Sequence, residues 1–370
     1  MIIDTKKYII SVVIFLSILL IFLATTNYYI DPLSLFNKEN KSSTSKTKLF
    51  YEKTINSKYG VYLDEKKFSF REVKKFFALN NQKKECAIIG SSVVDMINGS
   101  VTNNLGEDLS NLKDQCSSVL NLSVPQSVYE DYFAFTYLLL QNPNPPKKII
   151  FNIDPHSFTK YNYLWDYFSN EYYAMYNLIF SDNNNQSYFF TEKNKLKRNL
   201  ENILSFEYFL ISIKQFFFKN EFLPEEAEYF NPSKGSDKIH VIFSDGSGVT
   251  ERKLIEKKNF NVTEDFRIVN GKYFQEKTFQ DFEKLILYLK KNFEVMLLLV
   301  PRHVNNFSTK HTETLNALNF IENKVYNLSK KNNITLLGSY NPNKLNCKND
   351  EFINYLYAKY SCLKKIKEMN

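Results

Sequence analysis

The chain has 370 residues, of which 44% are hydrophobic and 16% aromatic. This composition excludes a disordered protein and suits one large domain, or a core domain with a sizeable insertion. The net charge of +8 is spread over 48 Lys and Arg residues with no Arg-rich stripe among aromatics, so no nucleic-acid partner is expected. The four histidines are scattered and no Cys-x-x-Cys pair occurs, so the sequence predicts no metal site and no cofactor.

An uncharged apolar segment, residues 8–26, lies close to the N-terminus. Its length is near the ~20 residues that a helix needs to cross a bilayer, and it predicts a membrane anchor. The alternative is a cleavable signal peptide, whose apolar region is usually shorter. Lys6 and Lys7 precede the segment, whereas the next lysine is Lys38. We therefore expect a single-pass membrane protein with a cytoplasmic tail at residues 1–7 and the bulk of the chain outside the cytoplasm.

A polar stretch rich in Ser, Thr and Lys follows, so residues 27–66 are predicted to form a membrane-proximal linker. Beyond it, apolar runs of strand length alternate with stretches of helical spacing. This alternation predicts an α/β domain, residues 67–157 and 281–370, with a flavodoxin-like parallel sheet in the order 2-1-3-4-5 and helices on both faces. The predicted strands are residues 86–89, 118–122, 148–153, 295–300 and 334–337, and the predicted helices are residues 68–79, 128–140, 282–291 and 315–330.

The alternation breaks in a large insertion, residues 158–280, which is rich in Tyr and Phe. It contains a predicted helix at residues 200–218 and a predicted turn at residues 244–248. Because the insertion leaves the sheet at the carboxyl end of the third strand, we expect a lid or a substrate-recognition subdomain over the ligand site. The alternative is an elaboration whose aromatic residues serve only packing.

Four cysteines fit an oxidising compartment, where disulfides persist. Cys86 and Cys116 lie near the starts of two neighbouring predicted strands, and Cys347 and Cys362 bracket a short C-terminal loop. These two pairs are the favoured disulfides among the three connectivities that four cysteines allow. The alternative is four separate buried thiols.

The most informative segment runs from Cys86 to Val94, because a buried apolar run ends there at Gly90-Ser91-Ser92. In an open α/β sheet, ligands bind at the carboxyl ends of the strands, and a serine on the strand-to-helix turn presents its hydroxyl at that edge. Ser92 is therefore the first candidate nucleophile. The alternative is a tight turn in which a serine serves as a helix N-cap.

Polar residues also follow the next two predicted strands: Gln126 after the second, and Asp154 and His156 after the third. With these segments the chain resembles the SGNH (GDSL-like) hydrolase family, in particular membrane-anchored relatives associated with cell-surface glycans. The resemblance covers about residues 86–363 in the order of motifs, with the long insertion as a departure. It implies an esterase or acyltransferase that acts on O-acyl groups of a cell-envelope glycan, with Ser92 as the nucleophile.

The resemblance also assigns Ser91, Gln126 and Asp154 to the oxyanion and substrate site. Gln126 stands where the family places a glycine for the oxyanion hole, and its backbone N–H survives that change. Asp154 stands where the family places an asparagine, and an ionised Asp supplies no hydrogen-bond donor.

The largest departure is near the C-terminus, where the family has an Asp shortly before its catalytic His. By alignment, Asn354 stands for the aspartate and Tyr357 for the histidine, and no histidine follows His311. A phenol is a poor base at neutral pH, and loss of a triad member typically costs several orders of magnitude in rate.

His156, with Asp154, could replace the missing pair, because the third strand neighbours the strand that carries Ser92 in the predicted order. His303, after the fourth strand, would have to reach further. Two alternatives remain: an inactive relative that binds glycan or serves as a partner in an envelope assembly, and a purely structural membrane-tethered protein.

Overall fold

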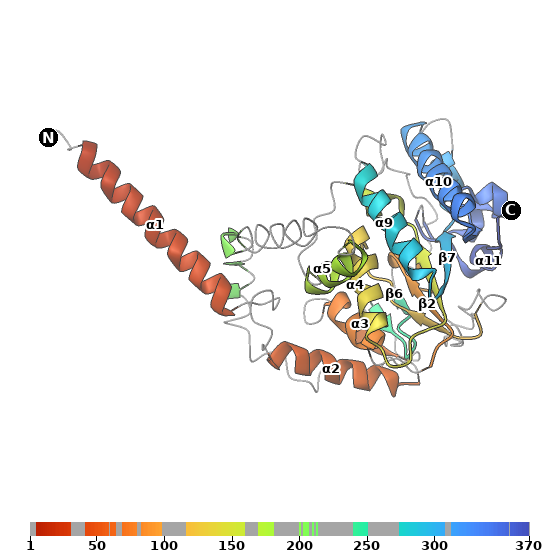
Figure 1. Cartoon of the computed structure of the whole chain (residues 1–370), viewed down its shortest axis with the longest axis horizontal. Coiled ribbons are helices and arrows are strands. Elements are labelled where there is room, and N and C mark those ends of the chain that lie inside the picture. The colour runs from red at the N-terminus through yellow and green to blue at the C-terminus, as the bar shows by residue number, and fades with distance from the viewer. Residues whose placement is uncertain are drawn as a thin grey trace.

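A long N-terminal helix leads to an α/β body in this computed structural model (Figure 1). The structure describes residues 5–30, 41–58, 60–63, 69–79, 83–97, 116–159, 169–180, 200, 203–206, 209–210, 212–213, 240–250, 274–307, 312–354 and 356–369.

Five parallel strands form the central sheet, in the order β3-β2-β4-β7-β8, which is 2-1-3-4-5 in chain order as predicted. Their bounds are β2 Cys86–Ile89, β3 Val119–Asn121, β4 Lys148–Asn152, β7 Glu294–Leu299 and β8 Thr335–Gly338. The register places Ile88 of β2 opposite Asn121 of β3 and Ile150 of β4, so the three strands end at the same edge. Short 3-10 turns follow three of the strands at this edge, η1 Ser92–Val94, η2 Pro155–Phe158 and η5 Val304–Phe307.

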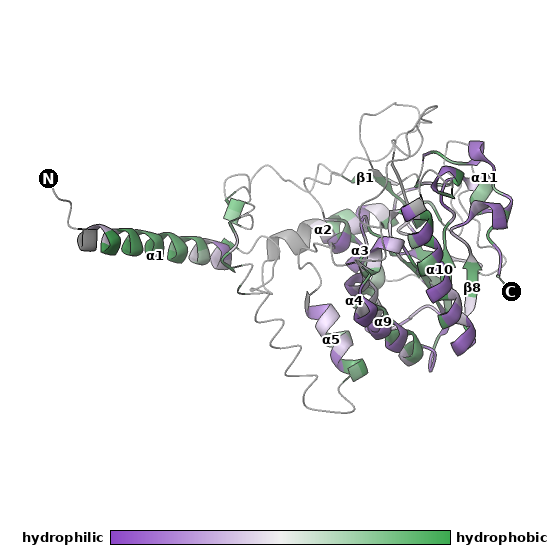
Figure 2. Ribbon diagram, turned by 90° about the horizontal axis from the view of Figure 1, so that it is seen from above, coloured by the Kyte–Doolittle hydropathy of each residue, from purple (hydrophilic) through white to green (hydrophobic). Residues whose placement is uncertain are grey.

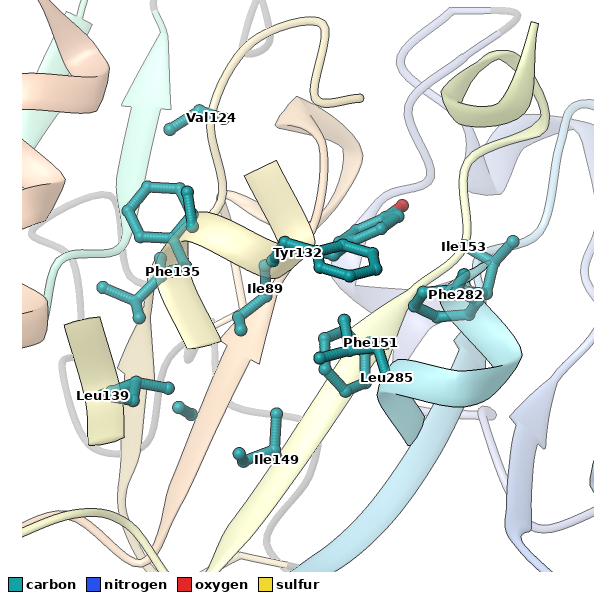
Figure 3. Packing of buried hydrophobic residues seen from close by; sticks show 14 of the residues in the cluster. Ile89, Val124, Tyr132, Phe135, Leu139, Ile149, Phe151, Ile153, Phe282 and Leu285 are labelled. Atoms are coloured by element: carbon teal, nitrogen blue, oxygen red, sulfur yellow. The ribbon is translucent and has the colours of Figure 1, made fainter. Parts of the chain in front are cut away.

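One face of the sheet is covered by long helices: α3 Phe70–Leu79, α4 Tyr129–Leu140, α9 Glu276–Leu289 and α10 Thr312–Asn332. In α9, the buried residues Phe279, Phe282 and Ile286 recur at helical spacing, and this apolar stripe faces the sheet. Figure 3 shows the result, with Tyr132 of α4 and Phe282 of α9 packed on Phe151 of β4.

The other face is covered, within the described residues, by short elements near the C-terminus: η7 Pro342–Leu345, η8 Asn349–Glu351 and α11 Tyr360–Leu363. Leu345, Phe352 and Leu363 from this region belong to one buried cluster with Ile88 and Ile150 of the sheet. Helices were expected on both faces, but in the described residues this second face is covered by short helical turns and not by long helices.

Both favoured disulfides are present. Cys86, at the start of β2, is bonded to Cys116, and Cys347 is bonded to Cys362. No free cysteine occurs in the described part of the chain. The second disulfide closes the C-terminal loop that lies at the carboxyl edge of the sheet.

Replacing Cys347 and Cys362 together by Ser is expected to lower the free energy of unfolding by about 3 kcal/mol, because the bond closes a loop with a sequence separation of 15 residues. A urea titration of the full chain in detergent measures the change. Reductant also opens the Cys86–Cys116 bond, which closes a longer loop, so the reduced wild type should show a larger loss than the double variant. A change below about 1 kcal/mol in both samples would contradict the expected constraint on the unfolded chain.

The N-terminal helix α1, Thr5–Ile30, contains a segment, Tyr8–Ile30, that is long and apolar enough to cross a membrane. Hydrophobic residues, coloured green, run along almost the whole helix in Figure 2. The predicted span, residues 8–26, ends before the helix does, because Asn27, Tyr28, Tyr29 and Ile30 continue the same helix.

The prediction of a linker is wrong for residues 41–63. This segment forms a helix, α2 Lys41–Ile55, and a strand, β1 Val61–Leu63. Phe50 and Tyr51 of α2 are buried in the main core, and the ring of Tyr51 lies 4.9 Å from that of Phe77 in α3. The prediction failed because the segment is rich in Ser and Lys overall, although a short apolar stripe within it packs α2 against the body.

The described parts of the insertion have two different positions. Helix α5, Ser169–Phe180, packs on α4, with Tyr172 and Tyr176 beside Phe133. This part serves packing, as the alternative interpretation expected. Strands β5 His240–Ile242 and β6 Gly248–Thr250 instead form an antiparallel sheet with β1, in the order β1-β5-β6.

The turn between β5 and β6, at the predicted residues 244–248, docks on the carboxyl edge of the parallel sheet. The Asn121 N–H donates to the Asp245 carbonyl over 2.9 Å, and the Gly248 N–H donates to the Asp95 carbonyl over 2.8 Å. Gly246 has φ +82°, and a Cβ there would lie 2.4 Å from the Asn121 carbonyl oxygen, so the turn requires glycine. This hairpin therefore reaches the edge where Ser92 lies.

Candidate functional site

Ser92 lies at the carboxyl edge of the sheet, immediately after β2. Ser91 is buried, whereas Ser92 is only partly buried, so its side chain is not enclosed in the core. Ser91 occupies the N-cap position of η1 but makes no side-chain capping bond. The interpretation of these serines as a simple N-cap therefore does not account for them.

Gly90 allows β2 to approach Asn152 at the end of β4. A Cβ on Gly90 would lie 2.5 Å from the Asn152 Cβ. The Asn152 Oδ1 accepts from the Ser91 N–H over 3.3 Å, and its Nδ2 donates to the Leu298 carbonyl over 3.3 Å. Asn152 thus links the three neighbouring strands just below the serines.

Replacing Gly90 by Ala is expected to destabilise the chain by about 1–3 kcal/mol, because the new methyl group overlaps Asn152 in a packed interior. The displaced backbone should also move Ser92 and slow its reaction with a serine-directed probe. Thermal unfolding and probe labelling measure the two effects. A variant with wild-type stability and wild-type labelling would show that the close approach is not needed.

Tyr357 lies against Ser92, as the alignment with the family histidine predicted. The two hydroxyl oxygens are 2.9 Å apart. Tyr357 also packs against a small cluster that joins β1, the β5–β6 hairpin and the segment after Ser92, formed by Tyr62, Met96, Val241, Phe243 and Ile353. The insertion therefore helps to place the side chain that stands for the family base.

The side-chain oxygen of Asn354 bonds the backbone and not the side chain of Tyr357. The Asn354 Oδ1 accepts from the backbone N–H groups of Leu356 and Tyr357, over 2.8 and 3.0 Å. Asn354 therefore holds the turn that presents Tyr357, a role in backbone geometry.

Asp154 lies at the centre of a buried polar network after β4. Its Oδ1 lies 2.5 Å from His156 Nδ1, and its Oδ2 accepts from the Ser91 hydroxyl over 2.6 Å and from Arg302 Nη2 over 2.8 Å. Asp154 and Arg302 are both almost fully buried. The residue next to Ser92 is thus tied directly to an Asp–His pair.

The charge state of this network follows from its neighbours. Burial alone would raise the pKa of Asp154, but Arg302, His156 and the hydrogen bond from Ser91 hold that pKa well below the ordinary carboxyl range. Burial alone would lower the pKa of Arg302, and Asp154 raises it. Both groups are therefore charged at neutral pH, and Asp154 cannot donate to an oxyanion.

Gln126 has φ +53°, a left-handed conformation that glycine adopts most readily. The backbone at this position would therefore suit a glycine equally well. Arg71 stabilises the loop: its Nε and Nη2 bond both carboxylate oxygens of Asp131 over 2.7 and 2.8 Å, and Nη2 also reaches the Gln126 carbonyl over 3.4 Å. The Gln126 side chain is exposed.

His303 follows β7 and is buried, with a pKa lowered by that burial. Its Nδ1 accepts from the Asn305 N–H over 3.1 Å, and its ring packs on Phe352 at 5.2 Å. These contacts give His303 a local role in the loop. His311 lies outside the described residues.

Two site residues, Arg302 and Asn152, were not predicted. Arg302 comes directly after a strand, at the same edge as Asp154, and that position was its only signal. Within the part of the chain that the structure describes, no group of three or more His, Cys, Asp or Glu side chains could hold a metal ion.

Comparison of the sequence with protein-family models and with curated proteins finds no match. The assignment of function therefore depends on the motifs and on the geometry at the sheet edge.

Proposed function

We propose that this chain is a membrane-anchored, SGNH-like esterase or acyltransferase that acts on O-acyl groups of a cell-envelope glycan. The observation that carries the proposal is the Asp154–His156 pair, which is hydrogen-bonded through Asp154 to Ser91, the residue beside Ser92. His156 Nδ1 lies 2.5 Å from Asp154, and with the proton on Nδ1 the neutral imidazole would have its acceptor at Nε2, the tautomer that a general base of this kind needs.

In this proposal the Ser92 Oγ attacks the ester carbonyl and His156 Nε2 takes its proton. Collapse of the tetrahedral intermediate breaks the ester C–O bond, and the leaving sugar oxygen takes the proton from His156 to become a hydroxyl. The acyl group on Ser92 then passes to water in an esterase, or to another hydroxyl in an acyltransferase. Backbone N–H groups, including that of Gln126, would stabilise the oxyanion.

These reaction steps require the Ser92 hydroxyl to turn from Tyr357 toward His156. Arg302 would assist the proposed reaction electrostatically. Its positive charge offsets that of Asp154 and so weakens the repulsion between that carboxylate and a developing oxyanion.

The anchoring part of the proposal rests on α1, and the extracytoplasmic placement rests on the two disulfides and on Lys6 and Lys7 before the apolar segment.

A second candidate, a non-catalytic glycan-binding or assembly-partner protein, is favoured by a specific observation. The Ser92 hydroxyl is hydrogen-bonded to a phenol at the position of the family base, and Asn354 is engaged by the backbone.

A fluorophosphonate probe separates the two candidates. The full chain in membranes is treated with the probe, and the labelled peptide is identified by mass spectrometry. Labelling at Ser92 that disappears in Ser92→Ala and after heat denaturation supports the enzyme. Absence of labelling, together with binding of acylated glycan by both wild type and Ser92→Ala, would overturn it in favour of the binding protein.

A further inference from the structure

A group of exposed apolar side chains lies beside the C-terminal end of α1. Leu200, Leu204, Phe206 and Leu210 are 50%, 51%, 63% and 46% exposed. They belong to the insertion, far from α1 in the sequence but next to it in space (Figure 1). We refer to these four residues as the apolar patch.

The segment that carries the apolar patch is attached to α1 by specific contacts. The Asn27 side chain is fully buried, and its Nδ2 donates to the carbonyls of Ile203 and Ser205 over 2.8 and 3.0 Å. The ring of Phe209 lies 5.8 Å from that of Phe22. A side-chain amide that bonds backbone carbonyls of a neighbouring segment is a common way of joining a membrane helix to another element.

These contacts fix the depth of the segment relative to α1. At 1.5 Å per residue, Asn27 lies about 29 Å along the helix from Tyr8, which equals the ~30 Å hydrocarbon thickness of a bilayer. Phe22 lies about 7.5 Å deeper than Asn27. If Tyr8 marks one boundary of the hydrocarbon, Asn27 marks the other, and Phe209 is held at the depth of the acyl chains.

Two further features place the membrane boundary at this level. Tyr28 and Tyr29, which are exposed on α1, follow Asn27 directly, and tyrosines concentrate where hydrocarbon meets headgroups. The stretch that precedes Leu200 contains four basic residues in six, Lys193, Lys195, Lys197 and Arg198, a composition that anionic headgroups attract.

From these observations we infer that the apolar patch inserts into the leaflet at the C-terminal end of α1, in the same bilayer that α1 crosses. The inference rests on the membrane anchoring in the proposed function. The insertion then gives the body a second attachment to the membrane, in addition to the anchor helix.

Brominated phospholipids test this inference, because bromine quenches tryptophan fluorescence only at short range. The single tryptophan is removed by Trp165→Phe, and one tryptophan is then returned at a chosen position. Phe206→Trp reports on the apolar patch and Phe15→Trp on the anchor. Phe320→Trp, at an exposed site of α10 distant from α1, is the matched control. Each full-length variant is placed in nanodiscs whose phospholipids carry bromine both near the headgroup end and near the middle of the acyl chains, because Phe15 lies about 18 Å along α1 from Asn27.

We expect strong quenching of Phe206→Trp, comparable with that of Phe15→Trp, and no quenching of Phe320→Trp. Quenching of Phe15→Trp without quenching of Phe206→Trp would overturn the inference. This is the result expected if a second copy or another protein, rather than lipid, covered the apolar patch. Absence of quenching at both Phe15→Trp and Phe206→Trp would instead overturn the membrane anchoring on which the inference rests. The probe-labelling experiment on Ser92 is independent of both outcomes.

Discussion

Replacement of His156 by Ala is expected to lower the rate at which Ser92 is acylated by about 10²- to 10⁴-fold, the contribution typical of a general base. The reason lies in the proposed mechanism, in which His156 takes the Ser92 proton. The ring of His156 is held by a 2.5 Å contact between its Nδ1 and Asp154, and the proposal assigns the proton transfer to its other nitrogen. The measurement is the rate of fluorophosphonate labelling under single-turnover conditions, compared with the wild type.

Tyr357→Phe is the matched control for this prediction. It removes the hydroxyl that bonds Ser92 but keeps the ring in its cluster. If His156 is the base, labelling of Tyr357→Phe should be at least as fast as that of the wild type, because the variant removes the bond between the phenol and the Ser92 hydroxyl. Loss of labelling in Tyr357→Phe with normal labelling in His156→Ala would transfer the role of base to the phenol.

Replacement of Arg302 by Met is expected to lower the free energy of unfolding by about 3–5 kcal/mol, the usual cost of removing one partner of a buried ion pair. Met keeps much of the volume but leaves the Asp154 carboxylate buried without its strongest neighbour. Urea titration of the full chain in detergent at neutral pH measures the loss.

Two controls make this prediction specific to the buried charge. Lys331→Met breaks the exposed pair with Glu283 and should cost no more than about 1 kcal/mol. The double variant Arg302→Met with Asp154→Asn removes both charges and should recover most of the stability. A double variant as unstable as Arg302→Met alone would show that the loss comes from packing.

The acid side of the stability profile should report on the same carboxylate. Because its pKa is lower in the folded state than in the unfolded state, Asp154 stabilises the fold above the ordinary carboxyl pKa, and this contribution is lost as the pH falls below that range. Asp154→Asn should therefore flatten the loss of stability in acid relative to the wild type.

The parallel sheet could be predicted because its strands are buried on both faces and appear as uninterrupted apolar runs, as in Cys86–Ile89. The three-stranded sheet could not. Each of its strands has three residues, and β1 pairs with β5 about 180 positions later, a contact without a local signal. The same holds for α2, whose apolar stripe is short.

Some residues of the candidate site could likewise be predicted from the sequence, and others could not. The positions of Ser92, Asp154 and Tyr357 follow from where strands end and from the order of motifs, and the structure brings Tyr357 to Ser92 and His156 to Asp154. Arg302 could not be singled out, because one arginine gives no sign in the sequence that it will be buried beside a carboxylate. His303, a candidate from its position, turns to its own loop.

The bond between Cys347 and Cys362 has a further consequence for when the site becomes complete. Thiols stay reduced in the cytoplasm, so in a body that is extracytoplasmic, as proposed, the loop that bears Tyr357 closes only once translocation exposes it to oxidants. Completion of the site would then be coupled to export, and molecules retained inside the cell would carry Ser92 without its phenolic neighbour held in place.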